Sequence, residues 1–202
     1  VAVPAVTPTS PTLTLRRPDD WHLHVRDGAQ LAAVVPFTAR QFGRALVMPN
    51  LQPPMTTTDA LAAYRARILP AVPAGLAFEP QMLYLTDSTS PAEIRKAQAS
   101  GFVVGAKLYP AGATTHSDAG VTSIDKVWPA LEAMAELGLV LQVHGEVTAS
   151  DIDVFDREQV FIDRVLSRVV ERVPHLKVVF EHITTRVAAE FVQGARAGVA
   201  AT

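Results

Sequence analysis

Trp21-His22-Leu23-His24-Val25-Arg26-Asp27-Gly28 places two histidines two residues apart at the end of an apolar stretch. In a β-strand, side chains two residues apart point to the same face, whereas on a helix they lie about 200° apart around the axis. A strand would therefore direct the imidazoles of His22 and His24 toward one point, which suits a metal ion. The alternative is a pair of ordinary histidines on a half-buried strand. The metal interpretation gains support because later apolar stretches also end in residues able to bind a metal: Lys107, His144 and His182.

The composition predicts one globular domain. The chain has 202 residues, 49% of them hydrophobic, which suffices for a sizeable core. Its net charge is −2 and its basic residues form no stripe, so we do not expect nucleic acid as a partner. No apolar run approaches the roughly 18 residues of a membrane span. We interpret residues 1–12, with three prolines and no basic segment, as a flexible arm and not a signal peptide, and we expect a cytoplasmic domain over residues 13–202.

Cysteine is absent from the sequence. Disulfides and thiolate zinc sites are therefore excluded, and any metal must be bound by nitrogen and oxygen atoms. This directs attention to the six histidines. His116 falls in a predicted loop and His175 precedes a predicted strand, so neither is a candidate ligand.

Apolar stretches alternate with segments of helical spacing along the chain. The predicted strands are residues 13–26 (one or two strands), 45–48, 78–85, 102–109, 139–144, 176–182 and the beginning of another at 199–202. The predicted helices are residues 30–41, 59–69, 90–100, 123–137, 155–173 and 185–195. Most of these strands are too continuously apolar to have a face in water, which indicates a parallel sheet covered by helices.

Two architectures fit this pattern, an open doubly wound sheet and a TIM-type (β/α)8 barrel. No glycine-rich turn opens the first helix, which weakens the dinucleotide-binding version of the open sheet. The ligand-type residues at strand ends converge at the mouth of a barrel, whereas a flat sheet would spread them over roughly 20 Å. We therefore predict a barrel of which this chain supplies six strand–helix units and the start of a seventh. Such barrels typically need about 250 residues, so we expect this one to be incomplete at its C-terminus.

Lys107 lies near the end of a strand otherwise made of apolar residues. Burying its ammonium group is costly, so we expect Lys107 to be paired, neutral or chemically changed, unless its side chain reaches solvent at the strand end. His144 and His182 each end a mostly apolar strand and have a glutamate close by, Glu146 and Glu181. Singly, each histidine could be an ordinary core residue.

Five motifs carry a specific resemblance to a known family. They are 22–28 (HLHVRDG), 48–50 (MPN), 105–110 (GAKLYP), 143–146 (VHGE) and 180–185 (FEHITT). In this order the sequence resembles the dihydroorotases of the amidohydrolase superfamily, in their short bacterial-type branch, from about residue 13 to residue 202.

The resemblance implies a zinc-dependent barrel enzyme with two Zn²⁺ ions. His22 and His24 would bind one zinc, and His144 and His182 the other. Lys107 would be carboxylated on its amine and bridge the two ions. A carbamate is an anion, which suits a buried site with two cations better than an ammonium group does.

The resemblance also implies a small-molecule substrate and the reaction that consumes it. The enzymes interconvert L-dihydroorotate and N-carbamoyl-L-aspartate in pyrimidine biosynthesis. Arg26 and Asn50 would hold the substrate carboxylate, for which the guanidinium offers a fixed fork of donors. Thr114 and Thr115 match a loop that closes over substrate. The general acid/base of the family is an aspartate on the eighth strand, which is not present in this chain.

Two alternatives remain open on this evidence. One is another cyclic-amide hydrolase, such as a hydantoinase, for which Arg26 and Asn50 would have little use. The other is a non-catalytic dihydroorotase-like subunit or fragment, against which the intact ligand set argues. We expect a homodimer, and we expect these 202 residues to be inactive alone.

Overall fold

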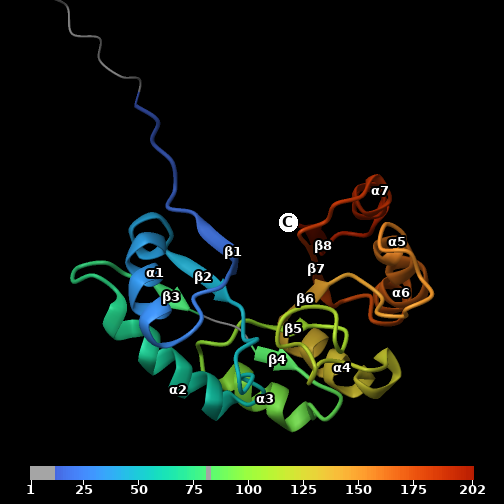
Figure 1. Ribbon diagram of the computed structural model, residues 1–202, viewed down its shortest axis with the longest axis horizontal. Helices are drawn as coiled ribbons and strands as arrows, with labels where there is room; N and C mark the ends of the chain where they lie inside the picture. The colour runs from blue at the N-terminus through green and yellow to red at the C-terminus, as the bar shows by residue number, and fades with distance from the viewer. Residues whose placement is uncertain (1–11, 81–82) are drawn as a thin grey trace, which may run out of the picture.

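The computed structural model describes residues 12–80 and 83–202 as strands alternating with helices (Figure 1). The strands are β1 (Asp19–Leu23), β2 (Arg44–Val47), β3 (Glu79–Pro80), β4 (Leu83–Leu85), β5 (Gly105–Leu108), β6 (Val140–His144), β7 (Lys177–Glu181) and β8 (Val199–Ala201). The α-helices are α1 (Gly28–Gln41), α2 (Thr58–Ile68), α3 (Pro91–Ala99), α4 (Trp128–Leu137), α5 (Arg157–Phe161), α6 (Ser167–Arg172) and α7 (Arg186–Gly194). Two short 3₁₀ segments, η1 (Leu69–Ala71) and η2 (Ile124–Lys126), and one π-helical segment, η3 (Ile162–Leu166), complete the list.

All paired strands are parallel, in the order β1-β2-β3 and β4-β5-β6-β7-β8. The strand order follows the chain without the reversal that defines a doubly wound sheet. The strands lie along an arc with the helices on its outer side, and β1 and β8 stand at its two ends (Figure 1). The predicted architecture, part of a (β/α) barrel, is therefore confirmed.

A hydrogen bond across the inside of the arc joins strands far apart in the sequence. Gln142 of β6 is fully buried, and its Nε2 donates to the backbone oxygen of Trp21 in β1 at 2.6 Å. A flat sheet could not bring β1 and β6 together in this way, because adjacent strands lie about 4.8 Å apart. The inner face of the arc is thus a barrel interior.

Helix α2 forms where the sequence predicts a helix. Thr57 caps it by accepting a hydrogen bond from the backbone N–H of Ala60, and Leu61, Tyr64 and Ile68 are buried on one face. Within the described residues, no helix has the length and apolar character needed to cross a lipid bilayer.

Four sequence predictions differ from the structure. The helix predicted over 123–137 is divided into η2 and α4. Residues 12–18 have no regular structure and are exposed, so the first strand begins at Asp19; Pro18, which has no N–H to donate, directly precedes it. The helix predicted over 155–173 is divided into α5, η3 and α6. In α1, the apolar residues Leu31, Val34, Val35 and Phe37 have helical spacing that predicts one buried face. Leu31 and Val35 are buried, but Val34 and Phe37 are exposed, and the Arg40 guanidinium lies over the Phe37 ring.

Two predictions fall partly outside the described residues. The strand predicted over 78–85 is present as β3 and β4, on either side of residues 81–82, which are not described. Of the arm predicted over residues 1–12, only Thr12 is described.

Candidate metal centre

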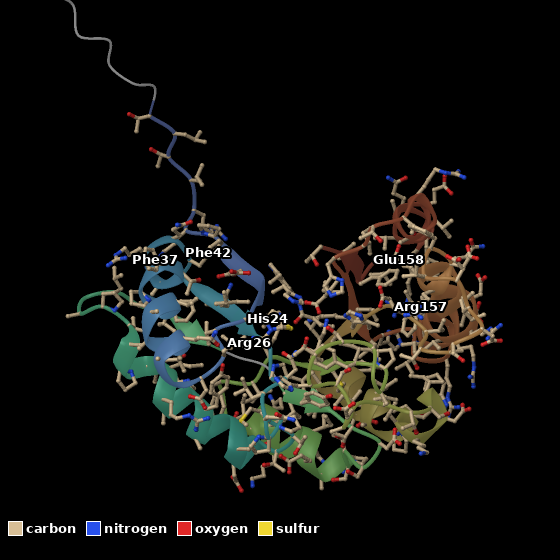
Figure 2. The ribbon with its side chains drawn as sticks, viewed as in Figure 1. His24, Arg26, Phe37, Phe42, Arg157 and Glu158 are labelled. Carbon is tan, nitrogen blue, oxygen red and sulfur yellow. The ribbon has the colours of Figure 1, made fainter. Side chains whose placement is uncertain are left out.

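The predicted ligands lie at the carboxyl ends of the strands. His22 is in β1, Lys107 in β5 and His144 is the last residue of β6, while His24 and His182 directly follow β1 and β7. Parallel strands end at the same edge, so these side chains share one mouth of the barrel. His24 and Arg26 lie on the inner side of the arc, away from Phe37 on the outside (Figure 2).

The four histidines form a continuous group. The Nε2 atoms of His22 and His24 are 3.1 Å apart. The ring centroids of His22 and His182 are 5.1 Å apart, and those of His182 and His144 are 4.8 Å apart. The structure thus brings together the two histidine pairs that the sequence predicts as ligands.

His22, His24 and His144 are half-buried and His182 is exposed, and partial desolvation favours the neutral form of their imidazoles. Desolvation, together with nearby positive charge, lowers the pKa of both His22 and His24 to about 4 and that of His182 to about 3. The charge is that of Lys107 for His22 and His182, and first that of Arg26 for His24. Burial also lowers the pKa of His144. A neutral imidazole offers a nitrogen lone pair to a metal.

Lys107 is fully buried, so its side chain does not reach solvent. Its Nζ contacts the carboxylate of Glu181, which is also fully buried, and lies 5.0 Å from the centre of the Tyr109 ring. Burial lowers the pKa of Lys107 well below its usual range.

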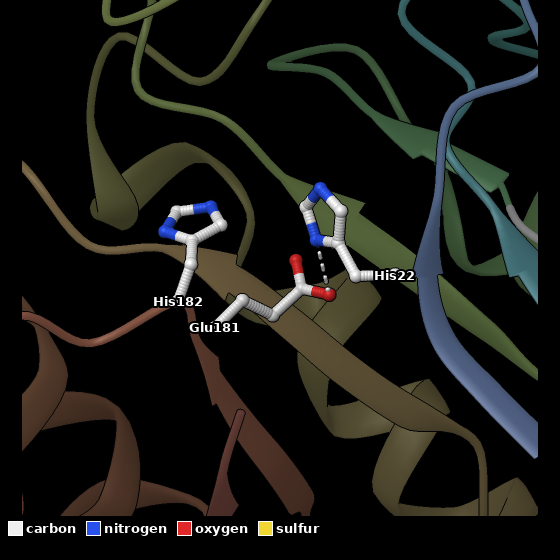
Figure 3. Close-up of side chains that lie close together, drawn as sticks. All are labelled: His22, Glu181 and His182. Carbon is white, nitrogen blue, oxygen red and sulfur yellow. Dashed lines mark hydrogen bonds and ion pairs between the residues drawn. The ribbon is translucent and has the colours of Figure 1, made fainter.

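Glu181 joins Lys107 to the histidines, a role that the sequence did not predict. One of its oxygens lies 3.0 Å from Nδ1 of His22 (Figure 3). Ligand atoms of His22, Glu181 and His182 all lie within 4.8 Å of one another. The available signal was a carboxylate at the end of the apolar run 178–180, where a charge needs a partner.

The residues present fit a divalent metal. The donors are imidazole nitrogen and carboxylate oxygen, which suit zinc. Two neutral rings face each other through Nε2 atoms at 3.1 Å, where only one of the two can donate a proton. Within the described part of the chain, the buried Nδ1 of His24 has no hydrogen-bond partner. The nitrogen lone pairs of such neutral rings are available to a bound cation.

Arg26 and Asn50 supply further buried polar groups beside the histidines. Among the described residues, Nη1 of Arg26 and Oδ1 of Asn50 are buried and have no hydrogen-bond partner of good geometry. The backbone of Arg26 is fixed by the hydroxyl of Tyr64, which donates to its carbonyl oxygen at 2.5 Å. These groups could bind an anionic ligand at the edge of the metal centre.

The loop at 110–122 reaches the site through its backbone. Nδ2 of Asn50 donates to the carbonyl oxygen of Thr115 at 2.9 Å. Thr114 instead bonds to Ser117, whose hydroxyl donates to the Thr114 carbonyl at 2.7 Å. The side chains of Thr114 and Thr115 are exposed, so the structure brings Thr115 to Asn50 by its carbonyl and leaves Thr114 within the loop.

Residues with a left-handed backbone conformation occur in and beside the candidate metal centre. Arg26, His116 and His182 have φ values of 55°, 55° and 42°, and they are the residues other than glycine with positive φ in the described chain. Such conformations cost free energy and persist where the surroundings enforce them, commonly at functional sites. Two of the three are predicted site residues, and the third lies in the loop over the site.

Comparison with known proteins gives consistent matches. The family described as Amidohydrolase matches residues 17–186. A dihydroorotase of Azoarcus sp. (strain BH72) is 69% identical over 192 residues, which are 95% of this chain and 56% of that protein. The crystal structure of a dihydroorotase from Campylobacter jejuni superposes with a TM-score of 0.83 at 39% identity, over 92% of this chain and 53% of that one.

More distant structures share the fold alone. An L-hydantoinase from Arthrobacter aurescens superposes with a TM-score of 0.66 at 18% identity, over 92% of this chain and 46% of that one. The chain spans about half the length of the curated relatives that it matches.

Proposed function

Because the chain belongs to the amidohydrolase family, we propose that it is part of a dihydroorotase, which interconverts L-dihydroorotate and N-carbamoyl-L-aspartate in pyrimidine biosynthesis. The observation that carries this proposal is the grouping of four imidazoles with a fully buried lysine at the mouth of a barrel. The 69% identity to a dihydroorotase supports it.

Two zinc ions would occupy the site. His22 and His24 would hold one ion, His144 and His182 the other, and Lys107, carboxylated, would lie between them. When bound, the metal pair would supply a nucleophile from water at neutral pH and polarise the amide carbonyl.

Lys107 is suited to carboxylation. Only a neutral amine can attack carbon dioxide, and burial lowers the pKa of Lys107 well below its usual range. The Nζ lone pair forms the new N–C bond, and the nitrogen loses one proton. The resulting carbamate anion would be compensated by the metal ions, whereas an unpaired ammonium at full burial would be strongly destabilising.

Arg26 and Asn50 would bind the substrate carboxylate, since both present buried polar atoms without a described partner. The backbone contact between Asn50 and Thr115 would connect this carboxylate site to the loop that carries Thr114 and Thr115. A hydantoinase substrate without a free carboxylate would leave the Arg26 guanidinium uncompensated, so a dihydroorotase accounts better for these residues.

These 202 residues would be inactive alone, because the aspartate that would act as general acid/base is not among them. We further propose a homodimer in the cytoplasm, by analogy with the family that the sequence resembles.

Ligand binding tests the proposal independently of turnover. We expect the zinc-loaded chain to bind L-dihydroorotate more tightly than hydantoin, which lacks the carboxylate, in isothermal titration calorimetry. Arg26→Ala should weaken dihydroorotate binding by roughly 2–5 kcal/mol and leave zinc content unchanged, because Arg26 is assigned to the substrate and not to the metal.

A matched control is Arg67→Ala. Arg67 pairs with Asp27 at 2.8 Å on the surface next to Arg26, and its loss should leave dihydroorotate affinity unchanged. Equal affinity of the wild-type chain for dihydroorotate and hydantoin would contradict the proposal.

A further inference from the structure

Glu158 is a buried acid of α5 whose side chain is 8% exposed. It lies on the outer side of the sheet, away from the metal centre (Figure 2). Its carboxylate accepts hydrogen bonds from the backbone N–H of Thr184 at 3.1 Å and of Thr185 at 2.9 Å, and from the hydroxyl of Thr185. All three donors belong to the turn that directly follows His182.

The turn held by Glu158 connects a proposed metal ligand to a helix. Thr185 caps α7, because its side chain accepts a hydrogen bond from the backbone N–H of Ala188 at 3.2 Å. The N–H groups of Thr184 and Thr185 have no partner inside α7, since they precede its first turn. The Glu158 carboxylate satisfies both groups and fixes the path of the chain between β7 and α7.

His182 depends on the residues that follow it. With φ at 42°, it has a left-handed backbone that a residue with a side chain rarely adopts. This conformation turns the chain sharply after Glu181, and it persists only if the surrounding contacts enforce it. On one side, the N–H of His182 donates to the Thr202 hydroxyl at 2.9 Å. On the other side, the turn anchored by Glu158 begins two residues later.

We propose that Glu158 is a positioning residue for His182: by holding residues 184–185, it fixes the backbone that directs the His182 imidazole toward the metal pair, without touching the metal or the substrate. The proposal rests on the proposed function, because it assigns His182 to a metal. Residues that orient metal ligands typically change metal affinity roughly 10- to 100-fold when they are lost.

The chain contains a matched control for a purely structural role. Glu93 of α3 accepts hydrogen bonds from the backbone N–H and the hydroxyl of Thr58, at 2.5 and 2.6 Å, where α2 begins. This is the same kind of contact, a glutamate holding the threonine at the start of another helix. Neither Thr58 nor its neighbours in α2 are proposed ligands.

Cobalt titration separates the two roles. The wild-type chain, Glu158→Ala, Glu158→Gln and Glu93→Ala are titrated with Co²⁺ while the visible ligand-field spectrum is recorded, and thermal unfolding is followed by circular dichroism. We expect Glu158→Ala to weaken the cobalt site of His144 and His182 by roughly 10- to 100-fold and to change its spectrum. Glu158→Gln keeps one acceptor oxygen, so its affinity should lie between those of the alanine variant and the wild type.

Glu93→Ala should lower the unfolding temperature and leave cobalt affinity and spectrum unchanged. If the wild-type chain binds cobalt and Glu158→Ala binds it with the same affinity and spectrum, the positioning role is overturned and the proposed function is not. The same holds if Glu93→Ala loses as much cobalt affinity as Glu158→Ala. If Glu158→Ala does not fold, wild-type affinity in Glu158→Gln overturns it. A wild-type chain that binds no cobalt would overturn the proposed function and this role together.

Discussion

Desolvation and nearby positive charge favour the neutral form of the histidines in the candidate metal centre. The pKa of His22 and His24 is lowered to about 4 and that of His182 to about 3, first because the charged imidazolium is removed from water. The site therefore presents neutral nitrogen donors at physiological pH, and no proton must leave these three rings when a metal binds.

A pH titration of the metal-free chain tests this state. We expect the ¹H and ¹³C resonances of His22, His24 and His182 to titrate near pH 4 or below. Since the folded pKa values lie below the unfolded value of 6.5, the unfolded chain binds more protons in this range. The unfolding temperature should accordingly fall as the pH decreases from about 6.5 to about 4. Titration of any of the three rings near pH 6.5 would show that the site is not desolvated.

At the scale of single residues, the sequence predicts which residues belong to the site better than it predicts which of them contact one another. His22, His144 and His182 could be found because each stands at or beside the end of an apolar strand, where parallel strands converge. The contact between His22 and Glu181 could not be found, since it joins residues 159 positions apart and depends on the curvature of the sheet. The hydrogen bond from Asn50 to the Thr115 carbonyl could not be predicted either, because every residue type has a backbone carbonyl.

At the scale of the elements, Gly145 sets how closely β6 and β7 approach beyond His144. A Cβ atom at this position would lie 1.8 Å from Cε2 of Phe180, and the Phe180 ring is fully buried in β7. The end of β7 also carries Glu181 and leads to His182. The glycine therefore permits the packing that holds the second half of the metal centre.

Gly145→Ala should destabilise the chain by about 1–3 kcal/mol, because the buried ring must move to admit one methyl group. The free energy of unfolding is measured by urea denaturation. Gly194→Ala, at the end of α7 with no atom within 4 Å of the added Cβ, is the control and should be close to neutral. If Gly145→Ala is as stable as the wild type, the Phe180 ring can move without cost, and the close approach of Gly145 to this ring has no structural role.

Helical periodicity and capping predict some elements well and others only in part. Helix α2 was predictable because a threonine cap precedes a regular buried face. The division of residues 157–172 into α5, η3 and α6 was not, because its apolar residues are compatible with one continuous helix. The first strand was predicted to begin at residue 13 because Leu13 and Leu15 alternate with polar residues as in a strand. These two leucines are 81% and 63% exposed and pair with no strand among the described residues.

At the scale of the whole molecule, four strands have a single paired neighbour among the described residues: β3 and β4, on either side of residues 81–82, and β1 and β8 at the two ends of the arc (Figure 1). β1 pairs with β2 and β8 pairs with β7, and neither has a second neighbour among residues 12–80 and 83–202. Open edges expose unpaired backbone donors and acceptors that can pair with another chain. The barrel could nevertheless be predicted from the sequence, since only a curved sheet brings all the strand-end ligands to one place.

The open edges predict that the isolated chain self-associates. We expect sedimentation velocity to show species larger than 21.7 kDa, with their fraction increasing as the protein concentration rises. A monodisperse 21.7 kDa species across the concentration range would show that the edges are protected.

The central claim, that Lys107 and the four histidines form one metal centre with a carboxylated lysine, is tested most directly by ¹³C NMR. The wild-type chain and Lys107→Ala, each shown to be folded by circular dichroism, are equilibrated with ¹³C-bicarbonate with and without zinc. We predict one protein-bound carbamate resonance that requires zinc in the wild-type chain and is absent from Lys107→Ala. No zinc-dependent carbamate resonance in the wild type, or the same resonance in Lys107→Ala, would contradict the claim.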